Sequence, residues 1–401
     1  MSERPLRIHA VADSDSYLKW AAGLLSTVPG HWDRRLEVVR SPIAPSPSQI
    51  ADAVAATAFE DREVPQVTLR EFRRTVLAAA PDAVLLACTG PVVDALIREL
   101  SEVRAHLVLV TGLPGISIPA TVKAWLYRGA TDLFVVHSRR EVRDFDALRR
   151  MLSATGTVGL ATLPFLSAVP ASAAGAGDRR SVVFAPQAKV PRDADDRVRI
   201  LHALADLALA RSDLDVVVKL RARTGEEQTH RETDGYDLLW NDLVAQGTVT
   251  DGCLGFETGP MAEHLLRAAG FVTVSSTAAV EAMAQRVPLL VLDDFGVSGR
   301  MINKVFEGSG CLGSLGDLRA ARFRLPAPEW LADNYFHPPE ENDWMDRLAA
   351  LVEARRAGDL APAQSLLDGR HHWAARVRSR NRLTLRPSTL RFVSRVRSMA
   401  R

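Results

Sequence analysis

The chain has 401 residues, of which 47% are hydrophobic and 24% are charged. This composition is ordinary for a globular protein with a sizeable core and excludes a disordered or fibrous chain, and the length suggests two or three domains. No apolar run reaches the ~20 residues of a membrane-spanning helix. The first residues also lack the apolar core of a secretory signal, so we expect a cytoplasmic protein.

The cysteines argue against disulfides and against metal. Cys88, Cys253 and Cys311 are odd in number and far apart. They match neither a disulfide framework nor the paired spacing of a zinc site. The cysteines therefore predict neither disulfides nor a zinc site. Separately, we expect no bound metal and no cofactor beyond a substrate.

The net charge of +2 is unevenly distributed. Residues 369–401 contain ten Arg and no Asp or Glu, so the rest of the chain is acidic. Three interpretations stay open for this basic tail: a helix packed on the body with its Arg side chains in solvent, contact with an anionic membrane, or contact with nucleic acid. We favour the packed helix, keep peripheral contact of residues 370–401 with the inner membrane face as the alternative, and expect no nucleic-acid partner.

The first half of the chain alternates strand and helix signals. Apolar runs bounded by turn residues predict strands, and the residues between them have helical spacing, as in the predicted helix 91–103. A segment rich in Ala, Gly, Pro and Ser then follows and predicts a linker within residues 164–180. The predicted strands cover residues 6–11, 82–88, 106–111 and 132–137.

The alternation restarts after the linker and predicts a second unit of the same kind. Strands are predicted over 181–185, 215–220, 271–274 and 288–292, with helices over 193–211 and 278–285. Alternating strands and helices imply parallel sheets, so we predict two Rossmann-like, doubly wound α/β domains facing a cleft. An aromatic-rich helical extension would return to the first domain. The predicted boundaries are an acceptor domain 1–165, a linker 166–180, a donor domain 181–330 and a helical extension 331–401.

The clearest chemical signal is the segment FVTVSSTAAVE, in which a buried strand leads into Ser275, Ser276 and Thr277 and then into a helix. Hydroxyl side chains at a helix start accept hydrogen bonds from free backbone N–H groups. The same helix end favours a phosphate. Glu281, further along that helix, is placed to accept hydrogen bonds from ribose hydroxyls. The alternative is that the serines only cap the helix and Glu281 is solvated.

This segment, together with the Val287-Pro288 pair and the apolar strand after it, resembles the donor site of bacterial glycosyltransferases of the two-Rossmann-domain (GT-B) kind. The similar groups are the capsular polysaccharide and polysialic acid transferases and the teichoic acid glycerophosphate transferases. The wider stretch 274–310 also resembles a bacterial family that carries only a general glycosyltransferase label. The specific motifs cover residues 181–315. The resemblance implies that Ser275 and Ser276 hold the donor phosphate and that Glu281 binds the nucleotide ribose.

Positive side chains follow the strand predicted over 215–220. In the similar transferases this place carries a His-Pro pair that stabilises the departing phosphate, whereas this chain has Leu220 and Arg221. Lys219 or Arg221 can supply the positive charge instead, and His230 is a further candidate. The alternative is that these are ordinary surface charges.

An acidic pair follows the strand predicted over 288–292. Asp293 and Asp294 are placed to bind sugar hydroxyls, which we favour over a metal, and Gly296 and Gly299 would allow a ligand close to the backbone. The alternative is a capped turn before a helix predicted over 300–307.

The first domain should bind the acceptor and supply a base. Asp13 and then Asp15 are the candidates, because they follow the first strand and a shielded carboxylate can abstract a hydroxyl proton. The alternative is that they cap the next helix. His137 ends a later strand and is more readily explained as a structural hydrogen-bonding residue.

Together these features predict transfer of a sugar from a nucleotide-activated donor to an acceptor hydroxyl. The resemblance implies a metal-independent, inverting reaction in cell-envelope or capsular polysaccharide synthesis, with a glycan or a lipid-linked acceptor. No P-loop and no GxGxxG after the first strand are present, which disfavours other nucleotide enzymes. The alternatives are a nucleotide-sugar epimerase, a CDP-glycerol glycerophosphotransferase, and a non-catalytic protein that binds an envelope precursor.

Overall fold

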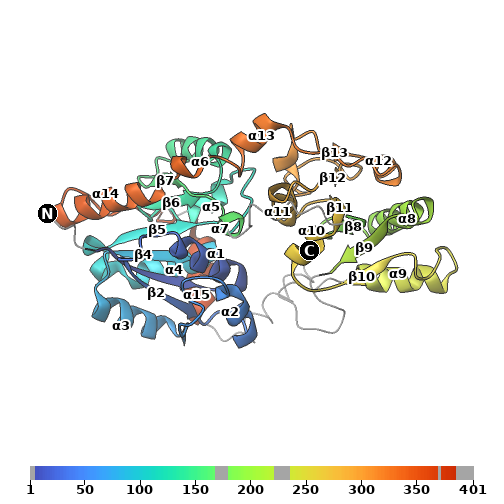
Figure 1. Ribbon diagram of the computed structural model, residues 1–401. Coiled ribbons are helices and arrows are strands. Elements are labelled where there is room, and N and C mark those ends of the chain that lie inside the picture. The colour runs from blue at the N-terminus through green and yellow to red at the C-terminus, as the bar shows by residue number, and fades with distance from the viewer. Residues whose placement is uncertain (1–4, 168–178, 221–234, 369–371, 385–401) are drawn as a thin grey trace. The chain divides into compact units, whose positions relative to one another are not determined.

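The computed structural model describes residues 5–167, 179–220, 235–368 and 372–384. These fall into two compact units (Figure 1). Unit 1 comprises Met1–Pro164 and His337–Arg401, and unit 2 comprises Phe165–Phe336. The segment after residue 336 therefore belongs with the N-terminal sheet, although it follows the C-terminal one in sequence.

Unit 1 is built on a seven-stranded sheet in the order β3-β2-β1-β4-β5-β6-β7, in which every pair is parallel. The strands are β1 (Arg7–Ala12), β2 (Asp33–Val39), β3 (Gln66–Val67), β4 (Ala83–Ala87), β5 (Val108–Gly112), β6 (Leu133–Val136) and β7 (Thr157–Leu160). Its helices are α1 (Asp15–Ser26), α2 (Pro47–Val54), α3 (Leu69–Ala79), α4 (Gly90–Glu99), η1 (Ser101–His106), α5 (Val122–Leu126), α6 (Arg139–Met151), η4 (Pro339–Glu341), α14 (Trp344–Ala357) and α15 (Trp373–Thr384).

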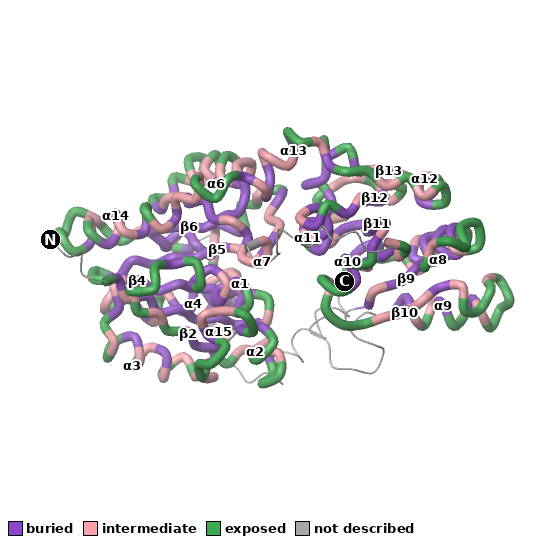
Figure 2. The backbone as a smooth tube through the Cα atoms, viewed as in Figure 1, coloured by how far each residue is buried: buried purple, intermediate pink, exposed green. Residues whose placement is uncertain are grey.

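Both faces of this sheet are covered by helices, which explains why its central strands β4, β5 and β6 are mostly apolar and buried. Along β1, Ile8 and Ala10 pack in the core beneath α1 and α14, whereas Val11 points to the opposite core beneath α3 and α4. This is the two-residue period of a strand. Figure 2 shows the strands as the buried interior. Helix α15 packs against α4, and Leu383 joins the core on that face.

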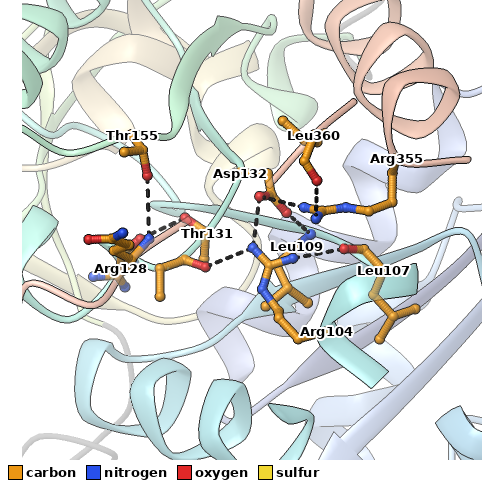
Figure 3. Close-up of polar contacts among 11 residues, drawn as sticks. Arg104, Leu107, Leu109, Arg128, Thr131, Asp132, Thr155, Arg355 and Leu360 are labelled. Atoms are coloured by element: carbon orange, nitrogen blue, oxygen red, sulfur yellow. Dashed lines mark hydrogen bonds and ion pairs between the residues drawn. The ribbon is translucent and has the colours of Figure 1, made fainter. Parts of the chain in front are cut away.

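Helix α14, in the C-terminal segment of unit 1, is fixed to the sheet by a buried ion cluster at Asp132. Arg104 Nη2 and Arg355 Nη2 lie 2.7 and 3.0 Å from Asp132 Oδ1, and the backbone N–H of Leu109 donates to Oδ2 at 2.8 Å. Figure 3 shows the two arginines approaching the carboxylate from different elements. All three charged side chains are buried, and the one carboxylate serves both guanidinium groups, so loss of Asp132 would leave two buried cations without their counter-charge. The cluster thus couples residues far apart in the sequence.

Unit 2 is built on a six-stranded parallel sheet in the order β10-β9-β8-β11-β12-β13. The strands are β8 (Ser181–Phe184), β9 (Asp215–Lys219), β10 (Gly255–Glu257), β11 (Ala268–Thr273), β12 (Leu289–Leu292) and β13 (Leu312–Gly313). The helices are α8 (Ala194–Ala210), α9 (Tyr236–Ala245), α10 (Met261–Leu266), α11 (Ala278–Ala284), η3 (Lys304–Phe306), α12 (Leu315–Arg319) and α13 (Pro328–Asp333). Helix α7 (Pro164–Ser167) spans the sequence boundary between the units.

The fold class predicted from the sequence, two parallel-sheet Rossmann-like domains, is confirmed. The helix predicted over 300–307 is wrong, because only Lys304–Phe306 forms a 3-10 turn. Ile302 has a φ of +59°, a left-handed conformation that a β-branched residue adopts rarely and that ends any helix. Among the described residues, no helix has the length and hydropathy needed to cross a membrane.

Candidate functional site

The strand order of unit 2 has its switch point between β8 and β11, because β9 lies on one side of β8 and β11 on the other. Ligands of open parallel sheets bind at the carboxyl ends of the strands at such a point. Thr273, at the end of β11, donates a hydrogen bond from Oγ1 to the carbonyl of Ala185, 2.8 Å away. The residues that follow, Ser275 to Thr277, therefore leave the sheet at its switch point.

The three hydroxyl residues have different environments. Ser275 is buried and its hydroxyl donates to the carbonyl of Ile302 at 2.7 Å. Ser276 is half-buried, and its Oγ accepts a hydrogen bond from the backbone N–H of Ala278 at 3.2 Å. Thr277 is exposed and its side chain does not cap α11. Ser276 thus caps the helix start while remaining accessible, and Ser275 holds the neighbouring loop.

That loop connects β12 to η3 and is clamped at two points. Besides the bond from Ser275 to Ile302, the buried Asn303 donates from Nδ2 to the carbonyl of Gly296 at 3.0 Å and accepts from the backbone N–H of Ser298 at 3.0 Å. Asn303 is fully buried. These bonds hold the left-handed Ile302 in place, a conformation that persists only when its surroundings enforce it.

The two acidic residues at the start of this loop have separate roles. Asp294 Oδ2 accepts a hydrogen bond from the backbone N–H of Leu315 at 2.7 Å, so it fixes the first turn of α12. Asp293 is half-buried, and burial raises the pKa of its carboxyl, with further increases from the charges of Asp294 and Asp317. Asp293 is therefore the member of the pair better placed to meet a ligand.

Lys219, the positive candidate that the structure describes, lies on the other side of the switch point. Lys219 ends β9 and is half-buried, in register with Glu257 of β10. Since β8 separates β9 from β11, the ends of β9 and β11 are about 10 Å apart at the usual strand spacing. Glu281 is half-buried within α11. Arg221 and His230 lie outside the described residues.

In unit 1 the switch point lies between β1 and β4. There Asp13 Oδ2 accepts hydrogen bonds from the backbone N–H of Thr89 at 3.0 Å and from the Thr89 hydroxyl. Asp13 is fully buried. Burial raises the pKa of its carboxyl, an effect opposed by the bonds from Thr89 and by the charge of Arg128. Asp13 therefore joins the two strand ends inside the protein, whereas Asp15, in the first turn of α1, is half-buried.

Arg128 completes this cluster. Its Nη2 donates to the Tyr17 hydroxyl and to the carbonyl of Cys88, both at 2.8 Å, and the guanidinium is 3% exposed. Burial raises the pKa of Tyr17 to about 12 and also raises that of the Cys88 thiol. The switch point of unit 1 is thus filled by the protein's own polar side chains, and of these the sequence analysis predicted a role only for Asp13.

His137, at the end of β6, is structural. Its Nε2 accepts a hydrogen bond from Trp20 Nε1 at 2.7 Å, and its Nδ1 lies 2.9 Å from the carbonyl of Ala161. Burial lowers the pKa of the imidazole to about 4. The carboxylate of Glu141 accepts from the backbone N–H groups of His137 and Ser117, both at 2.8 Å. The network fixes the loops that follow β5, β6 and β7.

One groove of about 510 Å³ lies in unit 2, at the opposite edge of the sheet from the predicted donor residues. It is formed at the amino ends of β8, β9 and β10, and its charged lining residues are Arg180, Asp215, Glu257 and Arg267. Because ligands of such sheets bind at the carboxyl ends, we do not assign the donor to this groove. Among the described residues, no group of three His, Cys, Asp or Glu is arranged to hold a metal ion.

Several solved structures are similar to this chain over most of its length. The chain is similar to a "putative UDP-N-acetylglucosamine 2-epimerase" from Listeria monocytogenes, with 12% identity over 88% of this chain and 96% of that one and a TM-score of 0.57. It is also similar to the UDP-GlcNAc 2-epimerase of Methanocaldococcus jannaschii, with 11% identity over 86% of this chain and 99% of that one and a TM-score of 0.53. A third similar structure is the UDP-GlcNAc 2-epimerase of Neisseria meningitidis bound to UDP-GlcNAc, with 9% identity over 79% of this chain and 90% of that one and a TM-score of 0.52. These likenesses establish the GT-B-type fold.

The family follows from the sequence. Residues 8–351 match the family described as "Putative glycosyltransferase (DUF6716)", and the chain belongs to this family. A search of curated proteins found no matching sequence.

Proposed function

We propose that the protein is a glycosyltransferase that moves a sugar from a nucleotide-activated donor to an acceptor hydroxyl. The observation that carries this proposal is the position of the accessible Ser276 and Thr277 at the switch point of unit 2, in a chain of a glycosyltransferase family. At that point of a parallel sheet, hydroxyl and backbone N–H donors suit the phosphates of a nucleotide.

Each donor residue then has a distinct task. Ser276 and Thr277 hold the donor phosphate, and Glu281 accepts hydrogen bonds from the ribose. Ser275, whose hydroxyl donates to Ile302, shapes the loop beside the phosphate. Asp293 binds sugar hydroxyls. Asp294 holds the neighbouring backbone in place by accepting a hydrogen bond from Leu315, the first residue of α12. Lys219, together with Arg221 and His230, neutralises the departing phosphate, as electrostatic stabilisation of the transition state requires.

Unit 1 binds the acceptor and supplies the proton acceptor of a metal-independent, inverting reaction. Of the two carboxylates that the sequence offers, Asp15 is half-buried at the start of α1, whereas Asp13 is enclosed and bonded to Thr89. We assign the reaction to cell-envelope or capsular polysaccharide synthesis on the basis of the sequence resemblance described above.

The test is a thermal-shift screen of the full chain against CMP, CDP, UDP, GDP and dTDP. A ligand that binds the native state raises the melting temperature by mass action. We expect one nucleotide to stabilise the wild type and to lose its effect in Ser276→Ala and in Glu281→Ala. The matched controls are Ser212→Ala and Glu263→Ala, exposed residues of unit 2 away from the switch point. If none of the five stabilises the wild type at millimolar concentration, the transferase proposal is wrong.

A nucleotide-sugar epimerase is the second candidate, because the solved structures similar to this chain include UDP-GlcNAc 2-epimerases. An epimerase needs no acceptor, whereas a transferase does. Incubation with the nucleotide-sugar of the base identified above, without acceptor, separates them: an epimeric nucleotide-sugar would support the epimerase, and an unchanged donor the transferase.

The basic tail is proposed to bring the enzyme to an anionic membrane surface. Most of residues 370–401 lie outside the described residues, so the proposal rests on their ten Arg and their apolar side chains. Each Arg near an anionic surface contributes about 1 kcal/mol. We expect the chain to float with vesicles containing phosphatidylglycerol and not with neutral ones. Binding that persists after Arg386, Arg391 and Arg395 are replaced by Gln would contradict this role.

A further inference from the structure

The turn that follows β8 lies beside the proposed phosphate site of unit 2. β8 and β11 are neighbours in the sheet (Figure 1), and two hydrogen bonds join their ends. The backbone N–H of Ala185 donates to the carbonyl of Val272 at 2.9 Å, and the Thr273 hydroxyl donates to the carbonyl of Ala185 at 2.8 Å. Residues 186–192 therefore leave the sheet about one strand spacing, ~5 Å, from the chain that leads to Ser276.

This turn is short and fixed to the body of unit 2. Val190 is buried in the core, so the chain returns to the interior soon after β8 ends. An antiparallel bridge joins Gln187 to Val190. The buried Arg197 of α8 holds the turn from inside, because its Nε donates to the carbonyl of Pro191 at 2.9 Å and its Nη2 to that of Ala188 at 3.1 Å. The tip of the turn is therefore held close to the end of β8.

Two exposed cations lie on this turn, Lys189 at its tip and Arg192 just before α8. Neither side chain has an ion-pair or hydrogen-bond partner among the residues that the structure describes. The next cations along the chain are used within the protein: Arg197 by the two carbonyls of the turn, and Arg199 by Asp196, whose Oδ1 is 3.0 Å from its Nη1. Within residues 186–199, Lys189 and Arg192 are thus the positive charges that remain for a ligand.

Carboxylates surround this edge of the sheet. Asp193 caps α8 by accepting a hydrogen bond from the backbone N–H of Asp195 at 3.0 Å, so a negative charge already occupies the start of that helix. At the end of β12, burial and then the charges of Asp294 and Asp317 raise the pKa of the Asp293 carboxyl. A phosphate that binds at this edge is repelled by these carboxylates. Cations on the adjacent turn offset that repulsion.

We propose that Lys189 and Arg192 bind the diphosphate of a nucleoside diphosphate donor that is held at Ser276. This assignment rests on the proposed function and names its donor class. A sugar joined to a nucleoside monophosphate carries one negative charge on its phosphate, whereas a sugar joined to a nucleoside diphosphate carries two, which two cations match. Arg can contact phosphate oxygens through two N–H groups and Lys as a point charge. Lys219, predicted for a similar role from the sequence, lies one strand farther away, because β8 separates β9 from β11.

The first test compares the monophosphate and the diphosphate of cytidine, uridine, guanosine and thymidine on the full chain, with Kd measured by calorimetry. Hydrogen bonds to charged groups are among the stronger ones, so the diphosphate of the preferred base should bind at least ~10-fold more tightly than its monophosphate. Equal binding of the two would overturn the assignment and leave nucleotide binding, and with it the proposed function, intact.

The second test removes the charges one at a time. In Lys189→Gln and in Arg192→Gln the Kd of the preferred diphosphate should rise about 10-fold, and that of the monophosphate should rise less. Lys189→Arg keeps the charge and should bind as tightly as the wild type. Added salt should weaken binding less in Lys189→Gln than in the wild type, because one screened charge is gone. The matched control is Arg211→Gln, which removes an exposed charge at the other end of α8 and should leave Kd unchanged.

The outcomes separate this assignment from the proposed function. If Ser276→Ala abolishes binding of the diphosphate while Lys189→Gln and Arg192→Gln bind it as tightly as the wild type, the turn is not part of the site and the transferase proposal stands. A larger loss in Lys219→Gln than in either turn variant would return the role to the end of β9. A wild type that binds none of the nucleotides would remove the transferase proposal and this assignment with it. The Tm without ligand, which exposed substitutions should leave unchanged, shows that each variant is folded.

Discussion

The two units have the same kind of sheet, yet their switch points are occupied differently. In unit 1 the ends of β1 and β4 are joined by Asp13 and Thr89, and Arg128 closes the space behind them. In unit 2 the ends of β8 and β11 are joined by the hydrogen bond from the Thr273 hydroxyl to the Ala185 carbonyl and by the backbone bond from Ala185 to Val272, and Ser276 beyond them stays accessible. Topology alone therefore does not make a site; the side chains at the switch point decide whether a ligand can enter.

This difference suggests a division of labour. A switch point filled by buried, hydrogen-bonded charges contributes to the stability of unit 1. The switch point of unit 2 has accessible hydroxyls and a clamped loop, which suit a nucleotide. The comparison can be tested by changing one switch point at a time.

Removing the buried cation of unit 1 should have the largest effect. In Arg128→Leu, Asp13 loses the positive charge that offsets its burial, and the Tyr17 hydroxyl and the Cys88 carbonyl lose their donor. A buried acceptor left without its donor costs about 1–3 kcal/mol, and Asp13 also loses a compensating charge, so we expect the free energy of unfolding to fall by about 3 kcal/mol in urea denaturation.

The matched control for that variant is Arg199→Leu on the exposed side of α8 in unit 2. It should change stability by less than about 0.5 kcal/mol, as surface substitutions usually do. If both variants unfold at the same urea concentration as the wild type, the cluster at the switch point of unit 1 does not stabilise the fold.

The sequence predicted the pattern of strands and helices because apolar runs and helical spacing are local signals. It did not predict the contents of the switch points, because Arg128 and Thr89 reach Asp13 only once distant segments have folded together. The same limit applies to His137, whose hydrogen-bond partners Trp20 and Ala161 lie on other elements. The short strands β3, β10 and β13 have too few residues for a period to be recognised.

Lowering the pH should reduce the free energy of unfolding, because the folded chain excludes a proton from His137. Burial lowers the pKa of this side chain to about 4 in the folded chain, whereas a free histidine titrates near 6.5. Between those values the unfolded chain binds a proton that the folded chain excludes. The free energy of unfolding therefore falls as the pH drops from 6.5 toward 4, by at most about 3 kcal/mol, and this contribution is constant above pH 7.

Urea denaturation of the wild type and of His137→Asn at pH 7, 6 and 5 measures this contribution. The variant lacks the titrating imidazole, so its stability should fall less between pH 7 and pH 5 than that of the wild type. Parallel losses in the two proteins would show that His137 is not the group responsible.

The smallest predicted effect is a difference in stability between Ser275→Ala and Ser276→Ala in unit 2. Ser275→Ala removes the hydrogen bond to the Ile302 carbonyl, which holds a left-handed residue in the loop. A buried hydrogen bond contributes about 1 kcal/mol, so the free energy of unfolding should fall by about that amount. Ser276 also caps α11, but its Oγ is only half-buried and its bond to Ala278 is long, at 3.2 Å. Ser276→Ala should therefore cost less than Ser275→Ala while abolishing the nucleotide-induced shift in Tm. If Ser276→Ala costs as much stability and leaves that shift unchanged, both serines are structural, and the two switch points differ less than their accessibility suggests.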